Sequence, residues 1–89
     1  MVSADARSTL AFQGYIIMFS VSLQRDGHVR HYSIQQSGSA GWEVKLEADR
    51  ELARHDNYHD WHRVERARDV FASEVSELTA RGWEVISDR

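Results

Sequence analysis

Cysteine is absent from the 89 residues of this chain, and so are long apolar runs. Without cysteine there is no disulfide framework, no thiolate nucleophile and no Cys-ligated zinc site, which fits a cytoplasmic protein. The longest apolar run, from Tyr15 to Phe19, has five residues, whereas a membrane-spanning helix needs about 18. The first residues also lack the basic and apolar regions of a secretory signal. We therefore expect a cytoplasmic chain with no membrane partner.

A surplus of basic residues is missing as well. Eleven basic residues stand against 14 acidic ones, so the formal net charge is −3. Proteins that coat DNA or RNA without sequence preference usually carry a basic surplus, so the charge disfavours that class. Ten of the eleven basic residues are arginine, a side chain suited to forked recognition of phosphate or carboxylate. A local basic face therefore stays open as an alternative.

The composition, with 42% hydrophobic and 28% charged residues, is that of an ordinary folded domain. A chain this short has too little surface to build a second core. Ser, Ala and Asp dominate the first eleven residues. We therefore expect a flexible tail over residues 1–14 and a single domain over residues 15–89.

The clearest local pattern is a β-hairpin centred on Asp26-Gly27. Residues 15–24 are predicted to form a strand, because Ile17, Phe19, Val21 and Leu23 alternate with the intervening residues, which is the period of a half-buried strand. Asp-Gly favours a two-residue turn, because both turn positions need a positive φ. The apolar residues of the two strands then share one face. The predicted cross-strand pairs are Leu23–Arg30, Val21–Tyr32 and Phe19–Ile34.

A third strand is expected after a loop over residues 37–41, which is rich in Gly and Ser. Residues Trp42–Glu47 alternate again, with apolar side chains on the inward face. The predicted inward residues of the whole sheet are Ile17, Phe19, Val21, Tyr32, Ile34, Trp42, Val44 and Leu46.

Asp49-Arg50 is a plausible turn into a fourth strand over residues 51–55. The register of this strand is ambiguous. A two-residue turn places Ala53 opposite Leu46, although Leu52 is the better inward residue. A β-bulge or a three-residue turn would resolve the conflict.

From Tyr58 to Arg81 the apolar residues recur every three or four positions, which predicts an amphipathic helix. Asn57 or Asp60 is placed to cap the start of this helix, and Gly82 is placed to end it in a left-handed conformation. The segment after Gly82 either adds a short edge strand or folds back on the helix. The repeating apolar positions are Tyr58, Trp61, Val64, Ala67, Phe71, Val75 and Leu78.

The apolar face of the sheet and the apolar stripe of the helix must both be buried, and packing the helix on the sheet in two layers buries both. The sequence therefore predicts an α+β fold. It is a two-layer sandwich in which an antiparallel four-stranded meander is followed by one long C-terminal helix, with room for a short final strand. Trp42 and Trp61 are expected in the core, and Trp83 is expected to be partly exposed.

Three histidines near the start of the helix, His55, His59 and His62, are candidates for a metal site, because imidazole is a common zinc ligand. Their spacing matches no metal signature, so we assign no metal and no other cofactor. The ordinary interpretation is a polar junction between strand and helix. A metal-responsive regulator is kept as an alternative function.

No catalytic constellation is visible in the sequence, whether paired carboxylates, a nucleophile with its base, or a glycine-rich phosphate loop. The hairpin register places Ser22 opposite His31. A hydrolase also needs a third group and an oxyanion hole, which an open sheet face does not supply. We therefore predict no catalytic residues and no enzymatic activity.

A single helix leaves much of a four-stranded sheet uncovered, and small domains often gain stability by association. The sequence thus favours a non-enzymatic interaction module that self-associates, most simply as a homodimer. The first alternative is a single-stranded nucleic-acid binder that uses the open sheet face and the arginines Arg63, Arg66 and Arg30. The predicted binding surface comprises Ser20, Ser22, His31, Lys45, Arg63, Arg66 and Trp83.

Overall fold

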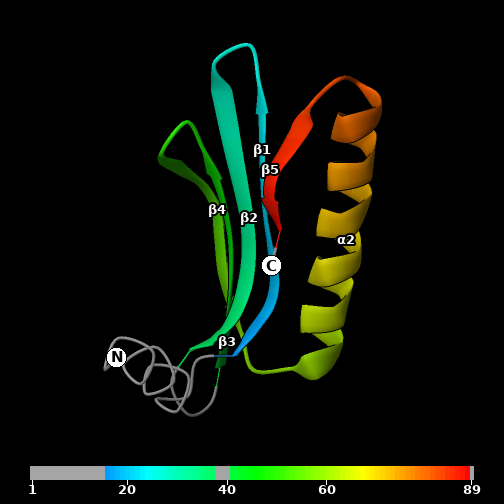
Figure 1. The fold of residues 1–89 in the computed structure, drawn as a ribbon. Helices are drawn as coiled ribbons and strands as arrows, with labels where there is room; N and C mark the ends of the chain where they lie inside the picture. Colours follow the sequence, from blue (N-terminus) through cyan, green and yellow to red (C-terminus); the bar gives the residue numbers. More distant parts are fainter. Residues whose placement is uncertain (1–15, 38–40, 89) are drawn as a thin grey trace, which may run out of the picture.

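The computed structural model describes residues 16–37 and 41–88, which form a five-stranded antiparallel sheet with a helix on one face (Figure 1). The order across the sheet is β4-β3-β2-β1-β5. The predicted α+β fold is confirmed, and the last segment adds an edge strand. The predicted tail over 1–14 and part of the loop over 37–41 lie outside the described residues. The elements are β1 (Ile17–Arg25), β2 (His28–Ser37), β3 (Gly41–Ala48), β4 (Glu51–Tyr58), α2 (Trp61–Ala80) and β5 (Glu84–Asp88).

The first hairpin has the predicted turn and register. Asp26 and Gly27 have φ values of 52° and 82°, and all three predicted cross-strand pairs are present. The expectation for Ile17 is wrong. Met18 is the extra residue of a β-bulge, so Ile17 pairs with Gln35 on the face away from the helix, where it is 57% exposed.

The second hairpin also turns at the predicted residues, and a bulge resolves its register. Asp49 and Arg50 have φ values of 52° and 71°. Strand β4 pairs Leu52 with Glu47 and Arg54 with Leu46, so Ala53 is the extra residue. The expected inward position of Leu52 is therefore wrong. Leu52 pairs with Glu47 on the face away from the helix, and it is 54% exposed. A bulge reverses the alternation of all residues that follow it.

Helix α2 begins three residues later than predicted, because β4 continues to Tyr58. Asp60 caps the helix, and its Oδ1 accepts a hydrogen bond from the backbone N–H of His62 at 2.9 Å. Trp61 is therefore the first helical residue. It is 45% exposed and lies edge-on to Trp42 with 5.3 Å between ring centroids. The expectation that Trp61 belongs to the core is wrong, because it stands at the open end of the helix.

The helix ends as predicted at Gly82, whose φ is 102°. The backbone N–H of Gly82 donates to the carbonyl of Thr79 at 3.1 Å, and that of Trp83 donates to Leu78 at 3.0 Å. These two bonds form a Schellman cap, in which glycine accommodates the positive φ. The chain then reverses directly into β5, which pairs with β1.

The core lies between α2 and the three middle strands. Phe71 fills its centre, where its ring packs edge-on against Tyr32 with 4.8 Å between centroids. Among the described residues, neither edge strand contributes a fully buried apolar side chain. The helix therefore covers the middle of the sheet and leaves both edges open. The buried apolar side chains are Leu23, Tyr32, Ile34, Val44, Leu46, Val64 and Phe71.

Replacing Phe71 by alanine is expected to lower the free energy of unfolding by about 3–5 kcal/mol, because it leaves a cavity at the centre of the core. The neighbouring Val70 is 44% exposed, so Val70→Ala is expected to cost less than about 1 kcal/mol. Urea unfolding followed by circular dichroism measures both. Equal losses in the two variants would contradict the helix orientation.

Candidate functional site

The open face of the sheet holds four of the residues predicted to bind, Ser20, Ser22, His31 and Lys45. Ser22 and His31 are paired as predicted, with 2.6 Å between Oγ and Nδ1. Proteins that bind single-stranded nucleic acid stack bases on aromatic side chains. The described part of this face carries no Phe, Tyr or Trp, so the geometry adds no support to the nucleic-acid alternative, which stays a prediction.

The other three predicted residues lie on the helix side of the sheet. Arg63 and Arg66 border a cleft between α2 and β4. Trp83 is half-buried, and the guanidinium carbon of Arg30 lies 5.4 Å from the centroid of its ring. The structure therefore divides the predicted binding surface between the two faces of the sheet instead of bringing its residues together.

The three candidate metal ligands are also separated. His55 points to the open face, where its Nε2 lies 2.8 Å from Glu43 Oε2. The His62 side chain is 86% exposed at the start of the helix, 4.0 Å from Glu65. His59 lies in the connection between β4 and α2. Within residues 16–37 and 41–88, no three His, Asp or Glu side chains gather around one ion position, so the metal-responsive alternative loses its geometric basis.

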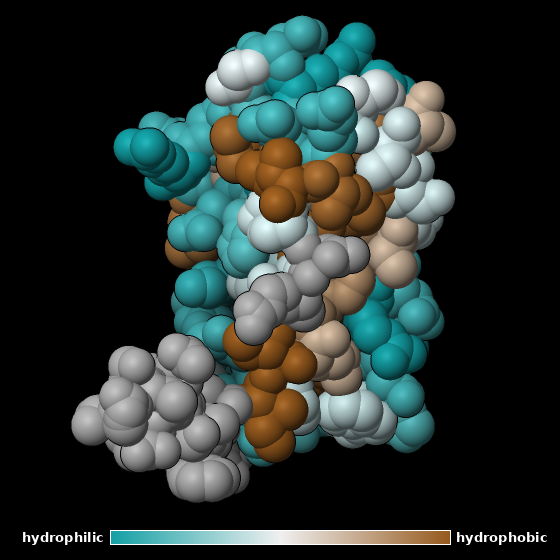
Figure 2. Space-filling model, in the orientation of Figure 1, coloured by the Kyte–Doolittle hydropathy of each residue, from teal (hydrophilic) through white to brown (hydrophobic). Residues whose placement is uncertain are grey.

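The two edges of the sheet differ in chemistry. Both edge strands are bulged, β4 at Ala53 and β5 at Ile86, so the bulges do not distinguish them. β4 carries charged side chains at Glu51, Arg54 and Asp56, and charges on an edge strand discourage pairing with another strand. β5 exposes Val85 and Ile86, at 47% and 48%. Figure 2 shows apolar surface over β5 and again near the start of β1, where Ile16 and Ile17 are exposed. Among the described residues β5 pairs with β1 alone, so its outer edge is free.

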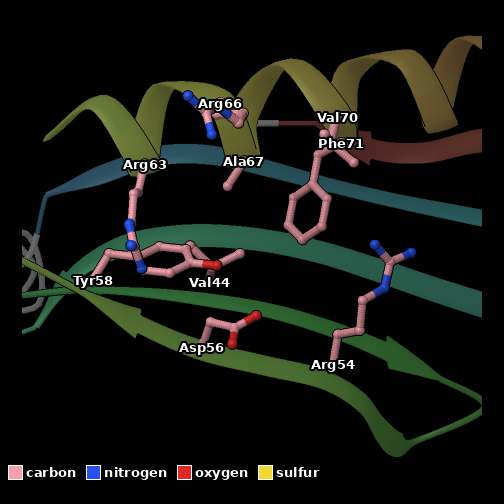
Figure 3. A pocket seen from close by; sticks show the side chains of 9 residues that line it. All are labelled: Val44, Arg54, Asp56, Tyr58, Arg63, Arg66, Ala67, Val70 and Phe71. Carbon is pink, nitrogen blue, oxygen red and sulfur yellow. The ribbon is translucent and has the colours of Figure 1, made fainter. Parts of the chain in front are cut away.

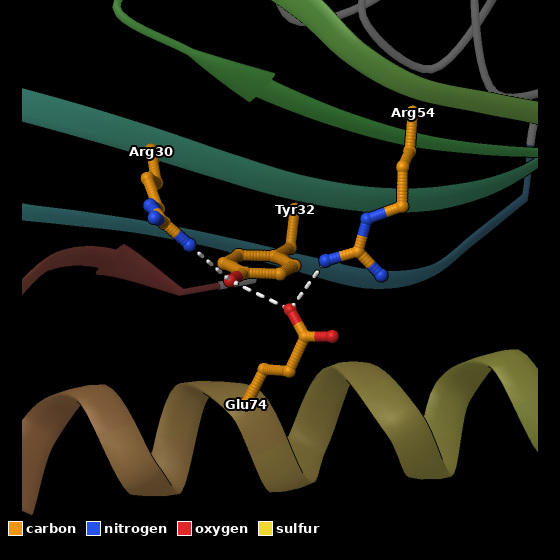
Figure 4. Close-up of polar contacts among 4 residues, drawn as sticks. All are labelled: Arg30, Tyr32, Arg54 and Glu74. Carbon is orange, nitrogen blue, oxygen red and sulfur yellow. Dashed lines mark hydrogen bonds and ion pairs between the residues drawn. The ribbon is translucent and has the colours of Figure 1, made fainter.

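A polar bridge joins the helix to the sheet at Glu74 (Figure 4). Glu74 Oε1 accepts hydrogen bonds from the Tyr32 hydroxyl at 3.1 Å and from Arg54 Nη2 at 2.6 Å. Arg30 Nη1 lies 3.4 Å from the same hydroxyl. Tyr32 is fully buried, and a buried hydroxyl without a partner is costly. Glu74 therefore provides the hydrogen-bond acceptor for the hydroxyl of Tyr32, the one polar side-chain atom of this core residue.

The charge of Glu74 is maintained by its partners. Burial alone would raise the pKa of Glu74, but hydrogen bonds from Arg54 and Tyr32 and the charges of Arg54 and Arg30 outweigh burial and lower that pKa. Burial also raises the pKa of Tyr32, so the phenol keeps the proton that it donates. The hydrogen bond to Glu74 in turn raises the pKa of Arg54.

A carboxylate with a lowered pKa stabilises the folded state above its unfolded pKa, and this contribution is lost as the pH falls through the folded value. Glu74→Gln is therefore expected to cost about 1–2 kcal/mol near pH 7, and the difference from the unaltered protein should shrink below about pH 4. Urea unfolding across a pH series measures it. Glu77→Gln is the control, because Glu77 is exposed on the same helix. A cost for Glu74→Gln that is independent of pH would contradict the bridge.

A cleft of about 340 Å³ separates the helix from β4 (Figure 3). Its β4 wall is formed by Arg54, Asp56 and Tyr58, which no sequence pattern predicted to line a cleft. Tyr58 was instead expected in the apolar stripe of the helix. Simple alternation from the turn would have turned Ala53, His55 and Asn57 toward the helix. Because Ala53 is an extra residue, Arg54, Asp56 and Tyr58 face the helix instead. The one sequence signal of this bulge was that a two-residue turn put Ala53, and not the more apolar Leu52, on the inward face.

No family model, curated protein or solved structure matches this chain. In the part of the chain that the structure describes, no helix is long and apolar enough to cross a membrane. The case for a function therefore rests on the geometry of the sheet edges and of the cleft.

Proposed function

We propose that this protein is a non-enzymatic interaction module that self-associates through the free edge of β5. The observation that carries the proposal is the contrast between the two edges of one sheet. β4 carries three charged side chains and one exposed large apolar residue, Leu52, whereas β5 exposes two adjacent apolar residues, Val85 and Ile86, beside a row of free backbone groups. An exposed apolar edge strand is a template for pairing with another strand.

A second copy of the same chain is the occupant that β5 fits. Two identical edge strands pair antiparallel around a twofold axis, the usual symmetry of small oligomers. If the twofold axis passes at Val85, Val85 of one copy faces Val85 of the other, and Glu84 faces Ile86. This register pairs the two Val85 side chains and keeps the carboxylates from standing directly opposite each other.

The size of the strand limits the strength of the dimer. β5 has five residues, and each backbone hydrogen bond adds a net of about 1 kcal/mol. Such an interface falls in the class below about 1,200 Å², which is typical of weak and reversible complexes. We therefore expect monomer and dimer to exchange at micromolar concentrations rather than form a permanent dimer.

The remaining parts of the proposal rest on the sequence. A non-enzymatic role is supported by the position of the Ser22–His31 pair on a flat sheet face, away from the cleft. The cytoplasmic location is supported by the lack of cysteine and stays a prediction.

Sedimentation equilibrium over about 1 µM to 1 mM protein is expected to show a monomer–dimer equilibrium. Ile86→Lys places a charge on the apolar edge, which disfavours strand pairing, and should weaken the dimer at least about ten-fold. Leu52→Lys is the matched control, because Leu52 is equally exposed but lies on β4. It should leave the equilibrium unchanged.

Two results would contradict the proposal. One is a monomer throughout the concentration range. The other is equal weakening by the two lysine substitutions, since this would remove the distinction between the edges. Circular dichroism confirms that each variant is folded before sedimentation is interpreted.

A further inference from the structure

The cleft between α2 and β4 is built from three kinds of surface. Its floor is apolar, with Val44 and Phe71 almost fully buried. Its helix rim carries Arg63 and Arg66, and its strand rim carries Asp56. The cleft lies at the β4 edge of the sheet, the opposite edge from β5. What it binds is therefore independent of the proposed self-association.

The bulge at Ala53 determines which polar side chains form the strand rim. It turns Asp56 and Tyr58 toward the helix, where they pair with Val44 and Trp42 of β3. In a two-layer fold, apolar residues would normally occupy this inward row and let the helix close on the sheet. Bulges that re-aim side chains are over-represented next to functional sites. Here the bulge keeps the cleft open and lines it with hydrogen-bonding groups.

The two arginines on the helix rim are available to a ligand. Arg63 and Arg66 are three residues apart, so they lie on neighbouring positions of the helix surface. Within the described residues neither forms an ion pair or a side-chain hydrogen bond, in contrast to Arg54, which Glu74 engages. Figure 3 shows Arg63 reaching from the helix toward Tyr58 across the cleft. Each guanidinium carries a positive charge, and a bound carboxylate forms charge-assisted hydrogen bonds with such groups.

Asp56 narrows the choice of ligand. A carboxylate on the opposite rim repels a second negative charge, and it accepts a hydrogen bond from a hydroxyl or amino group. The apolar floor of Val44, Ala67 and Phe71 suits a flat hydrocarbon ring. A ligand that satisfies all three surfaces carries one carboxylate, one ring and one hydrogen-bond donor at the far end of the ring.

We propose that the α2–β4 cleft binds a small aromatic monocarboxylate that bears a hydrogen-bond donor. Its carboxylate binds to Arg63 and Arg66, its ring lies on Val44, Ala67 and Phe71, and its donor binds to Asp56. The volume of about 340 Å³ falls at the lower end of small-molecule sites, which span roughly 300–1,000 Å³.

The test uses para-hydroxybenzoate, which has a carboxylate, a ring and a hydroxyl in this order. Two-dimensional amide NMR should show saturable shifts confined to Val44 and its β3 neighbours and to residues 54–58 and 63–71, with a Kd of about 1 mM, as expected for a ligand of this size. Benzoate lacks the donor, para-hydroxybenzamide lacks the charge, and inorganic phosphate lacks the ring. Each is expected to bind at least about five-fold more weakly.

Variants assign the contacts. Arg63→Gln and Arg66→Gln are each expected to weaken para-hydroxybenzoate about ten-fold, because each removes a charge-assisted hydrogen bond. Asp56→Asn should abolish the preference for para-hydroxybenzoate over benzoate. Arg68→Gln is the control, since Arg68 lies on the same helix outside the cleft, and its affinity should match that of the unaltered protein.

Three results would overturn the proposal. The first is the absence of saturable shifts in the cleft. The second is binding of the benzamide or of phosphate as tight as that of para-hydroxybenzoate. The third is an equal loss of affinity in Arg63→Gln, Arg66→Gln and Arg68→Gln, since this would reduce the interaction to general surface charge.

Discussion

One helix packed on a five-stranded sheet is the constraint on which the rest of this structure depends. Strands in a sheet lie about 4.8 Å apart, so five of them span roughly 19 Å, whereas a helix with its side chains is only about 10–12 Å wide. A single helix therefore covers the middle strands and not the edges. The core follows this rule, since its strand residues come from β1, β2 and β3.

This geometric limit explains how the molecule divides its surface. Under the helix, Phe71 and Tyr32 pack together, and Glu74 accepts a hydrogen bond from the hydroxyl of the buried Tyr32. Beyond the helix, each edge has its own chemistry. β5 stays apolar and free, which favours a second copy, while the bulged β4 directs polar groups into a cleft that favours a small anionic ligand. Because the edges are four strands apart, the two proposed interactions do not compete.

Much of the fold follows from local rules, but the candidate sites do not. The Asp26-Gly27 turn sets the first hairpin register, and the apolar period with Gly82 predicts the helix and its end. No sequence pattern predicts the bulges at Met18 and Ile86, whereas a bulge after the second turn is one of two ways to resolve the register of the fourth strand. A bulge depends on a tertiary fit that local patterns record poorly. At Met18 the bulge moves Ile17 to the open face, and at Ala53 it builds the strand wall of the cleft. The candidate sites thus lie at strand positions where a bulge interrupts the alternation of inward and outward side chains.

Amide hydrogen exchange at low and high protein concentration tests the central claim most directly, because it reports on both edges of the sheet in one experiment. The account predicts that the amides of β5 become more protected as the concentration rises, while those of β4 exchange at an unchanged rate. Protection that increases in β4, or that depends on concentration in neither edge strand, would contradict it.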